Sequence, residues 1–146
     1  MLLIGYGNPG RGDDGLGPAF AERIERAGPP GVAVLSDYQL TVEHAFDVAG
    51  ADCVVFADAL IGGDGAFRFT GAQSDTAADI GSHSLSPEAV LTLAATLYGA
   101  RPAAHVMAIS GVEFGEVKEG LSPRAQRNLD RACDFFFAWL AGYGNV

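Results

Sequence analysis

Three acids and one imidazole stand at positions where they could act together. Asp13 and Asp14 lie side by side directly behind the first apolar run of the chain, and Asp58 ends a later apolar run. His83 lies between small residues, which leave its ring accessible. Two carboxylates and one imidazole suit a borderline divalent cation and leave coordination positions open. The sequence therefore predicts a cation site formed by Asp14, Asp58 and His83.

The glycine-rich loop before the acid pair also resembles a phosphate-binding turn. Residues Gly5 to Gly10 match the pattern GxGxxG between an apolar run and a helical pattern. A pyrophosphate needs free amides and a positive helix end, whereas Asp13 and Asp14 would place two negative charges there. The acid pair therefore favours a cation, and we expect Asp13 to cap the helix and support it structurally. The residues expected to shape this loop are Gly7, Asn8, Gly12, Asp13 and Gly15.

Apolar patterns predict the elements that position these side chains. Strand-like runs occupy residues 1–5, 32–38, 53–57 and 105–109, and helical patterns occupy about 14–27, 41–50, 87–98 and 123–141. Alternation of Phe67 and Phe69 with polar neighbours suits a half-exposed edge strand that pairs antiparallel. This order predicts one domain over residues 1–146, a hydrolase-like three-layer α/β/α sandwich with about five mostly parallel strands. The expected buried stripe of the second helix is Val42, Ala45, Phe46 and Ala49.

Sites in such sheets form beyond the carboxyl ends of the parallel strands. Asp14 follows the first predicted strand, Asp58 the third and Glu113 the last, while Tyr38 and Gln39 follow the second. We therefore expect these side chains to be neighbours. Tyr38, Gln39 and Glu113 are candidates for contact with the substrate.

Composition and the remaining reactive residues exclude several classes of function. The formal charge of −9, from 18 acidic and 9 basic residues, disfavours nucleic acid as a partner. Cys53 and Cys133 lie far apart within apolar patterns, so we expect two buried thiols with no disulfide or metal site. His44 borders an apolar stripe and His105 begins its strand, so both are poorer ligand candidates than His83. Without a basic leader or a membrane-spanning apolar stretch, we expect a cytoplasmic protein with no membrane partner.

The stretch from Gly5 to Gly17, with Val55–Ala59 and Ser82-His83 in that order, resembles the hydrogenase maturation endopeptidases. These proteases remove the C-terminal extension of the [NiFe]-hydrogenase large subunit, and the resemblance covers nearly the whole chain. It implies that Asp14, Asp58 and His83 contact nickel already loaded into the precursor. Nickel then arrives with the substrate, and no dedicated organic cofactor is required. Residues 38–43 are similar to the subgroup that acts on cytoplasmic, cofactor-reducing hydrogenases.

Because nickel held mainly by thiolates accepts oxygen and nitrogen ligands only at open positions, cleavage would depend on metal insertion. The sequence offers no Ser-His-Asp or Cys-His arrangement for a covalent nucleophile. We therefore expect attack by water, assisted by the metal and one carboxylate. The loops 71–85 and 111–120 flank the expected site and could hold the substrate tail.

Two other functions remain open from the sequence. A non-catalytic module could dock on the nickel-loaded precursor without cutting it. Peptidyl-tRNA hydrolases also open with Gly-Asn-Pro-Gly, but they continue with a Thr-Arg-His-Asn element where this chain has Arg11-Gly-Asp-Asp14. The oligomeric state, the hydrogenase that is processed and the location of the docking surface are not readable from the sequence.

Overall fold

A single mixed sheet forms the centre of the molecule. The computed structural model describes residues 1–81, 84–115 and 117–143. Its sheet has the strand order β2-β1-β3-β5-β4, and only the last pair, β4 with β5, is antiparallel. The predicted mostly parallel sheet with an antiparallel edge strand is therefore confirmed. The strands are β1 (Leu2–Tyr6), β2 (Ala33–Asp37), β3 (Cys53–Ile61), β4 (Phe67–Gly71) and β5 (Ala103–Gly111).

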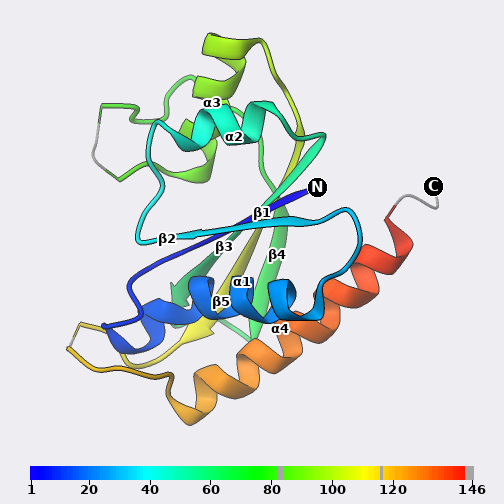
Figure 1. Ribbon diagram of the computed structural model, residues 1–146. Helices are drawn as coiled ribbons and strands as arrows, with labels where there is room; N and C mark the ends of the chain where they lie inside the picture. Colours follow the sequence, from blue (N-terminus) through cyan, green and yellow to red (C-terminus); the bar gives the residue numbers. More distant parts are fainter. Residues whose placement is uncertain (82–83, 116, 144–146) are drawn as a thin grey trace.

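Helices cover both faces of the sheet, as predicted. Figure 1 shows α2 and α3 on one face and α1 and α4 on the other, with the sheet between them. The helices are the 3₁₀ turn η1 (Gly12–Gly15), α1 (Leu16–Ala27), α2 (His44–Ala49), α3 (Pro87–Tyr98) and α4 (Pro123–Gly142). None of the helices in the described ranges combines the length and apolar character needed to cross a bilayer.

Each helix layer buries its own hydrophobic cluster against the sheet. Ile4 and Phe56 belong to the cluster beneath α2 and α3, whereas Leu3 and Val55 belong to the cluster against α1 and α4. Adjacent residues of one strand thus serve opposite faces, because side chains alternate across a sheet. Removing this apolar surface from water is the main stabilising term for the three layers.

Two serines fix where the long helices begin. The Ser86 hydroxyl accepts the Ala89 amide at the start of α3, and the Ser122 hydroxyl accepts the Ala125 amide at the start of α4, each at 3.1 Å. Proline follows each serine at the first helical position, as the sequence pattern predicts. These caps end the loops that lead to the carboxyl edge of the sheet.

The third strand is longer than the sequence pattern predicts. Asp58 lies inside β3 and pairs with Ala108 of β5, because β5 itself continues to Gly111. On the other side, the pairing of β3 with β1 stops at Ala57, opposite Gly5. Asp58 therefore borders the opening where β1 ends, and the third strand reaches past it.

The predicted stripe of the second helix was wrong for Val42 and Phe46, whereas Ala45 is buried and Ala49 packs against the core. Phe46 is 67% exposed and Val42 is 56% exposed, whereas His44, Ala45 and Val48 face the core. The α-helix begins only at His44, and the His44 Nδ1 accepts the Thr41 amide at 2.9 Å. This bond holds the imidazole inward, so the buried face is shifted from the expected one. The first turn of the predicted helix 14–27 also differs, because residues 12–15 are 3₁₀.

The start of α1 lies unusually close to the sheet. A Cβ atom on Gly17 would lie 2.2 Å from the Tyr6 carbonyl oxygen and 2.5 Å from the Ala57 carbonyl oxygen. A side chain cannot occupy this space, so glycine allows the helix to rest on β1 and β3. The close approach sets where η1, the preceding turn, lies against the carboxyl edge.

Replacing Gly17 with alanine should therefore push α1 off the sheet. We expect Gly17→Ala to lower the free energy of unfolding by about 2 kcal/mol or more, measured by urea denaturation. Gly142→Ala is the matched control, because nothing lies within 4 Å of the added Cβ atom. Equal stability of the two variants would contradict the close packing at Gly17.

Candidate active site

Asp14 is held at the carboxyl edge by the loop that follows β1. The Asn8 amide donates to Asp14 Oδ2 at 2.8 Å, and the Gly7 amide donates to the Asp37 carbonyl of β2 at 3.1 Å. Gly7 has a φ of 143°, and a Cβ atom there would lie 2.1 Å from the Asp14 carbonyl oxygen. Only glycine fits this position. The loop therefore fixes both the backbone and one carboxylate oxygen of Asp14.

Asp58 lies half-buried at the same edge, beside the hydroxyl of Tyr6. The Ala59 amide donates to Asp58 Oδ1 at 2.7 Å, and the Tyr6 hydroxyl donates a hydrogen bond to the same carboxylate. By strand alternation, Tyr6 and Asp58 point to the face covered by α2 and α3, as do Ile4 and Phe56. The negative charge of Glu88, in the first turn of α3, also raises the pKa of Tyr6, so the start of this helix lies at the edge of the site.

Asp58 and Asp14 are close enough for their negative charges to interact. Burial, and to a lesser extent the negative charge of Asp14, raise the pKa of Asp58 to about 6, against the lowering effect of the Ala59 and Tyr6 hydrogen bonds. Burial and the Asp58 charge also raise the pKa of the Tyr6 hydroxyl, so it stays a donor at neutral pH. Two half-buried carboxylates that repel each other form a site that a cation would stabilise. The predicted neighbours Asp14 and Asp58 are thus brought together.

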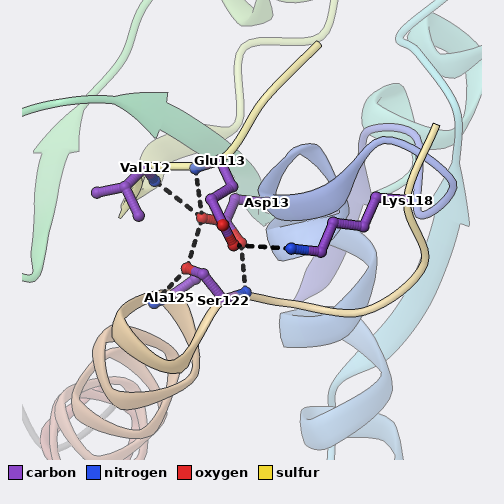
Figure 2. Close-up of polar contacts among 6 residues, drawn as sticks. All are labelled: Asp13, Val112, Glu113, Lys118, Ser122 and Ala125. Atoms are coloured by element: carbon purple, nitrogen blue, oxygen red, sulfur yellow. Dashed lines mark hydrogen bonds and ion pairs between the residues drawn. The ribbon is translucent and has the colours of Figure 1, made fainter. Parts of the chain in front are cut away.

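Asp13 points away from this pair and is fully buried. Its carboxylate accepts four hydrogen bonds (Figure 2): from the amides of Val112, Glu113 and Ser122 and from the Ser122 hydroxyl, at 2.7–2.9 Å. The Asp13 amide in turn donates to the Glu113 carbonyl at 2.8 Å. The sequence predicted that Asp13 caps its own helix, but its side chain makes no such bond. It joins η1 to the end of β5 and to the start of α4.

The charge of Asp13 is stabilised by these donors. Burial opposes ionisation, but the hydrogen bonds from Ser122, Glu113 and Val112 outweigh it and lower the pKa of Asp13. The Ser122 hydroxyl donates to Asp13 and accepts from the Ala125 amide, so the cap of α4 is part of the same network (Figure 2). This network fixes the loop after β5 relative to η1.

The other predicted site residues lie around this centre. Tyr38 is 70% exposed and lines a groove of about 210 Å³ with Gly7 and Asp37, and Gln39 follows it on the surface. The Glu113 side chain is exposed and pairs with Lys118 at 3.3 Å, in a second groove of about 220 Å³. His83 lies outside the described residues. Two positions beyond it, the buried Leu85 donates its amide to the Leu40 carbonyl at 3.2 Å.

No metal cluster is evident among the described residues. Within 1–81, 84–115 and 117–143, no three His, Cys, Asp or Glu side chains are grouped to hold an ion. His44 is buried with its Nε2 3.6 Å from Asp37 Oδ2, and His105 stacks on Phe69 at 4.9 Å near the amino end of β5. At the carboxyl edge, the described residues thus supply two of the three predicted ligands, the carboxylates of Asp14 and Asp58.

The local sequence pattern does not predict two residues of the site, Tyr6 and Ser122. The predicted strand 1–5 leaves Tyr6 in the loop, whereas in the structure Tyr6 belongs to β1 and its even spacing from Leu2 and Ile4 places it on the same strand face. The Ser122-Pro123 pattern is a local signal for a helix cap, but the bond from Ser122 to Asp13 joins residues 109 positions apart. A spacing rule could have found Tyr6, whereas no local pattern could have found the Ser122 contact.

Comparison with known proteins identifies the fold. No family model matches the sequence, and no curated protein matches it. The hydrogenase maturating endopeptidase HybD from Escherichia coli superposes with a TM-score of 0.72 at 22% identity, over 98% of this chain and 93% of that one. The [NiFe] hydrogenase maturation protease HycI from Thermococcus kodakarensis gives a TM-score of 0.70 at 23% identity, over 92% and 88%.

A third structure agrees with these two. The [NiFe] hydrogenase maturation protease HybD from Thermococcus kodakarensis has a TM-score of 0.71 at 18% identity, covering 94% of this chain and 97% of its own. This chain has the fold of the hydrogenase maturation proteases. The likeness runs along nearly the whole chain, so the predicted fold class and the structural side of the resemblance are confirmed.

The buried Asp13 carboxylate should be required for stability. We expect Asp13→Asn to lower the free energy of unfolding at pH 7 by about 3 kcal/mol, because the amide group cannot accept all four donors and loses the charge. Since the pKa of Asp13 is lowered, the wild-type advantage should be complete above the ordinary carboxyl pKa and lost as pH falls through the native pKa. Urea denaturation at several pH values measures both.

Asp14→Asn is the control for this variant, because the neighbouring side chain accepts only one backbone amide among the bonds described. Its stability should change by less than about 1 kcal/mol. A larger loss at Asp14 than at Asp13 would contradict the structural role of Asp13.

The pKa of Asp58 reports its electrostatic interaction with Asp14. By NMR, the Asp58 carboxyl should titrate near pH 6, and Asp14→Asn should lower this pKa without restoring the ordinary value, because burial is the larger cause. Between the ordinary 3.8 and about 6, the folded state binds more protons than the unfolded state, so this group should reduce stability as pH rises. An unchanged Asp58 pKa in Asp14→Asn would mean that the two carboxylates do not interact.

Proposed function

We propose that this protein is an endopeptidase that removes the C-terminal extension of a nickel-loaded [NiFe]-hydrogenase large-subunit precursor. The observation that carries the proposal is the interacting pair Asp14 and Asp58 at the carboxyl edge of the sheet. The fold supports it, because solved structures of this fold are named hydrogenase maturation endopeptidases. The motif resemblance from Gly5 to Gly17 supports it independently of the fold.

In this proposal the nickel belongs to the substrate and serves as a recognition signal. Asp14 and Asp58 each have one oxygen fixed by a backbone amide, which orients the carboxylates toward the edge. His83 is the third proposed ligand, on the strength of the sequence. The repulsion between the carboxylates is relieved when a cation enters, so binding is favoured only after the precursor has received its metal.

Cleavage is proposed to proceed by attack of water on the scissile carbonyl carbon. One of the two carboxylates, Asp14 or Asp58, accepts a proton from the water as the general base. The C–N bond then breaks, and the proton passes to the leaving amine. The nickel of the substrate polarises the reacting groups. Cys53 and Cys133 are buried in the core, which leaves neither thiol available as the nucleophile.

The proposed ligands give a direct test of the function. We expect Asp14→Ala, Asp58→Ala and His83→Ala each to reduce processing of a nickel-loaded precursor by at least 100-fold, because each removes a group that orients the metal. Mass spectrometry of the large subunit measures the loss of the extension. Circular dichroism should show a folded protein in each case.

The nickel-free precursor separates this function from the alternatives. Wild-type protein should shorten the loaded precursor and leave the nickel-free form intact. Binding of the loaded precursor without shortening would instead indicate a docking module. Processing at wild-type rates by all three variants would show that the site has been assigned wrongly.

A further inference from the structure

We infer that the C-terminal extension of the precursor binds as an added antiparallel strand on the open edge of β2. This inference rests on the proposed function and says how its substrate is held. β2 is the first strand in the order of the sheet, so within residues 1–81, 84–115 and 117–143 one of its sides has no neighbouring strand. An extended peptide is the partner that such an edge pairs with, through main-chain hydrogen bonds.

The hydrogen bonds of β2 leave an alternating set of peptide groups facing outward. The Ala33 amide and the Asp37 carbonyl both bond toward the β1 side, at 3.0 and 3.1 Å. Because inward and outward groups alternate along a strand, the peptide groups of Val34 and Ser36 point to the open edge. Ser36 is exposed and Val34 is half-buried, so a second strand can reach them.

Grooves flank this edge on both faces of the sheet. On the α1 face lies a groove of about 330 Å³, lined in part by Pro9, Pro18, Glu22, Glu25, Val34 and Ser36. On the α2 face lies a groove of about 820 Å³, lined in part by Ala33, Leu35, Phe46, Asp47 and Tyr98. Alternate side chains of an added strand would enter the two grooves in turn, because side chains alternate across a sheet.

The two grooves differ in the side chains that they fit. Phe46 and Tyr98 are 67% and 51% exposed and contact each other with ring centroids 5.8 Å apart, forming an apolar wall on the α2 face. On the α1 face, Glu22 and Glu25 line the groove, and Arg26 pairs with Glu22. A peptide that alternates apolar and basic side chains therefore fits this edge.

The position of the acid pair sets the direction of the peptide. β2 ends at Asp37, which is bonded to Gly7 in the loop that holds Asp14. With the nickel at Asp14 and Asp58, the scissile bond lies at this end, and the extension leads away from it. It then runs opposite to β2, and pairing along the five residues of β2 covers roughly 17 Å.

Other occupants fit less well. A second copy of this chain would bring acidic groove against acidic groove, at a formal charge of −9 for each copy. The opposite edge, β4, carries the exposed Arg68 and packs its phenylalanines on α4, through Phe67 and Phe69 with Phe135. The net charge of the chain and the bond between the end of β2 and the loop that holds Asp14 thus favour the substrate tail on β2.

Hydrogen–deuterium exchange tests the pairing directly. Wild-type protein is pulse-labelled within seconds of mixing with the nickel-loaded precursor, or with the same large subunit lacking its extension. We expect the Val34 and Ser36 amides to exchange at least tenfold more slowly with the extended form only. The Ala33 amide, already bonded toward β1, should change little.

A proline variant tests the same contact by kinetics. Ser36→Pro removes one outward amide and keeps the bonds to β1, so KM for the precursor should rise about tenfold with kcat unchanged. Gly71→Pro is the matched control, since Gly71 lies on the β4 edge between residues bonded to β5 and has nothing within 4 Å of an added Cβ atom. Its KM should stay at the wild-type value, and both variants are checked by thermal denaturation.

Each outcome decides the inference separately from the function. If the precursor is shortened but Val34 and Ser36 exchange alike with both subunits, the strand pairing is wrong and the function stands. If no shortening occurs, the function fails, and slower exchange that requires the extension still supports pairing on β2. Slower exchange without any precursor, with a dimer mass by light scattering, would assign the edge to a second copy and overturn the inference.

Discussion

The four hydrogen bonds of the buried Asp13 carboxylate hold together the edge of the sheet that carries the candidate active site. A buried charge is tolerated only when it is fully hydrogen-bonded, and here the donors come from the end of β5 and the start of α4. These segments lie about one hundred residues from Asp13 along the chain. One side chain therefore sets the position of η1 against the loop after β5, and with it the backbone that carries Asp14.

Adjacent acids thus have opposite environments. Asp13 faces inward to satisfied donors, which lower its pKa, whereas Asp14 faces the edge, where its charge helps to raise the pKa of Asp58. A turn of 3₁₀ geometry separates the directions of the two side chains. Asp13, whose charge is fully hydrogen-bonded, supports the backbone of Asp14, and a cation would relieve the repulsion between Asp14 and Asp58. Support by buried residues of this kind is what a precisely oriented binding site requires.

In the proposed function, the same edge connects the two carboxylates to a surface on which the substrate tail would lie. The Gly7 amide bonds to the last residue of β2, so the loop that orients Asp14 also ends the open strand. Grooves on both sides of β2 are bordered by acids on α1 and by exposed aromatic rings on α2 and α3. Metal recognition and tail binding would then occur along one continuous line, with the scissile bond between them.

The sequence alone determined the layers of the fold, because apolar periods of two and 3.6 residues and the serine-proline caps are local signals. It also predicted that Asp14 and Asp58 are neighbours, since the carboxyl ends of parallel strands share one edge. It could not determine the length of β3, which depends on pairing with β5, or the buried face of α2, which depends on the inward bond of His44. The inward turn of Asp13 and the hydroxyl of Tyr6 at Asp58 were likewise decided by tertiary structure. These contacts join residues distant in sequence, and no local pattern encodes them.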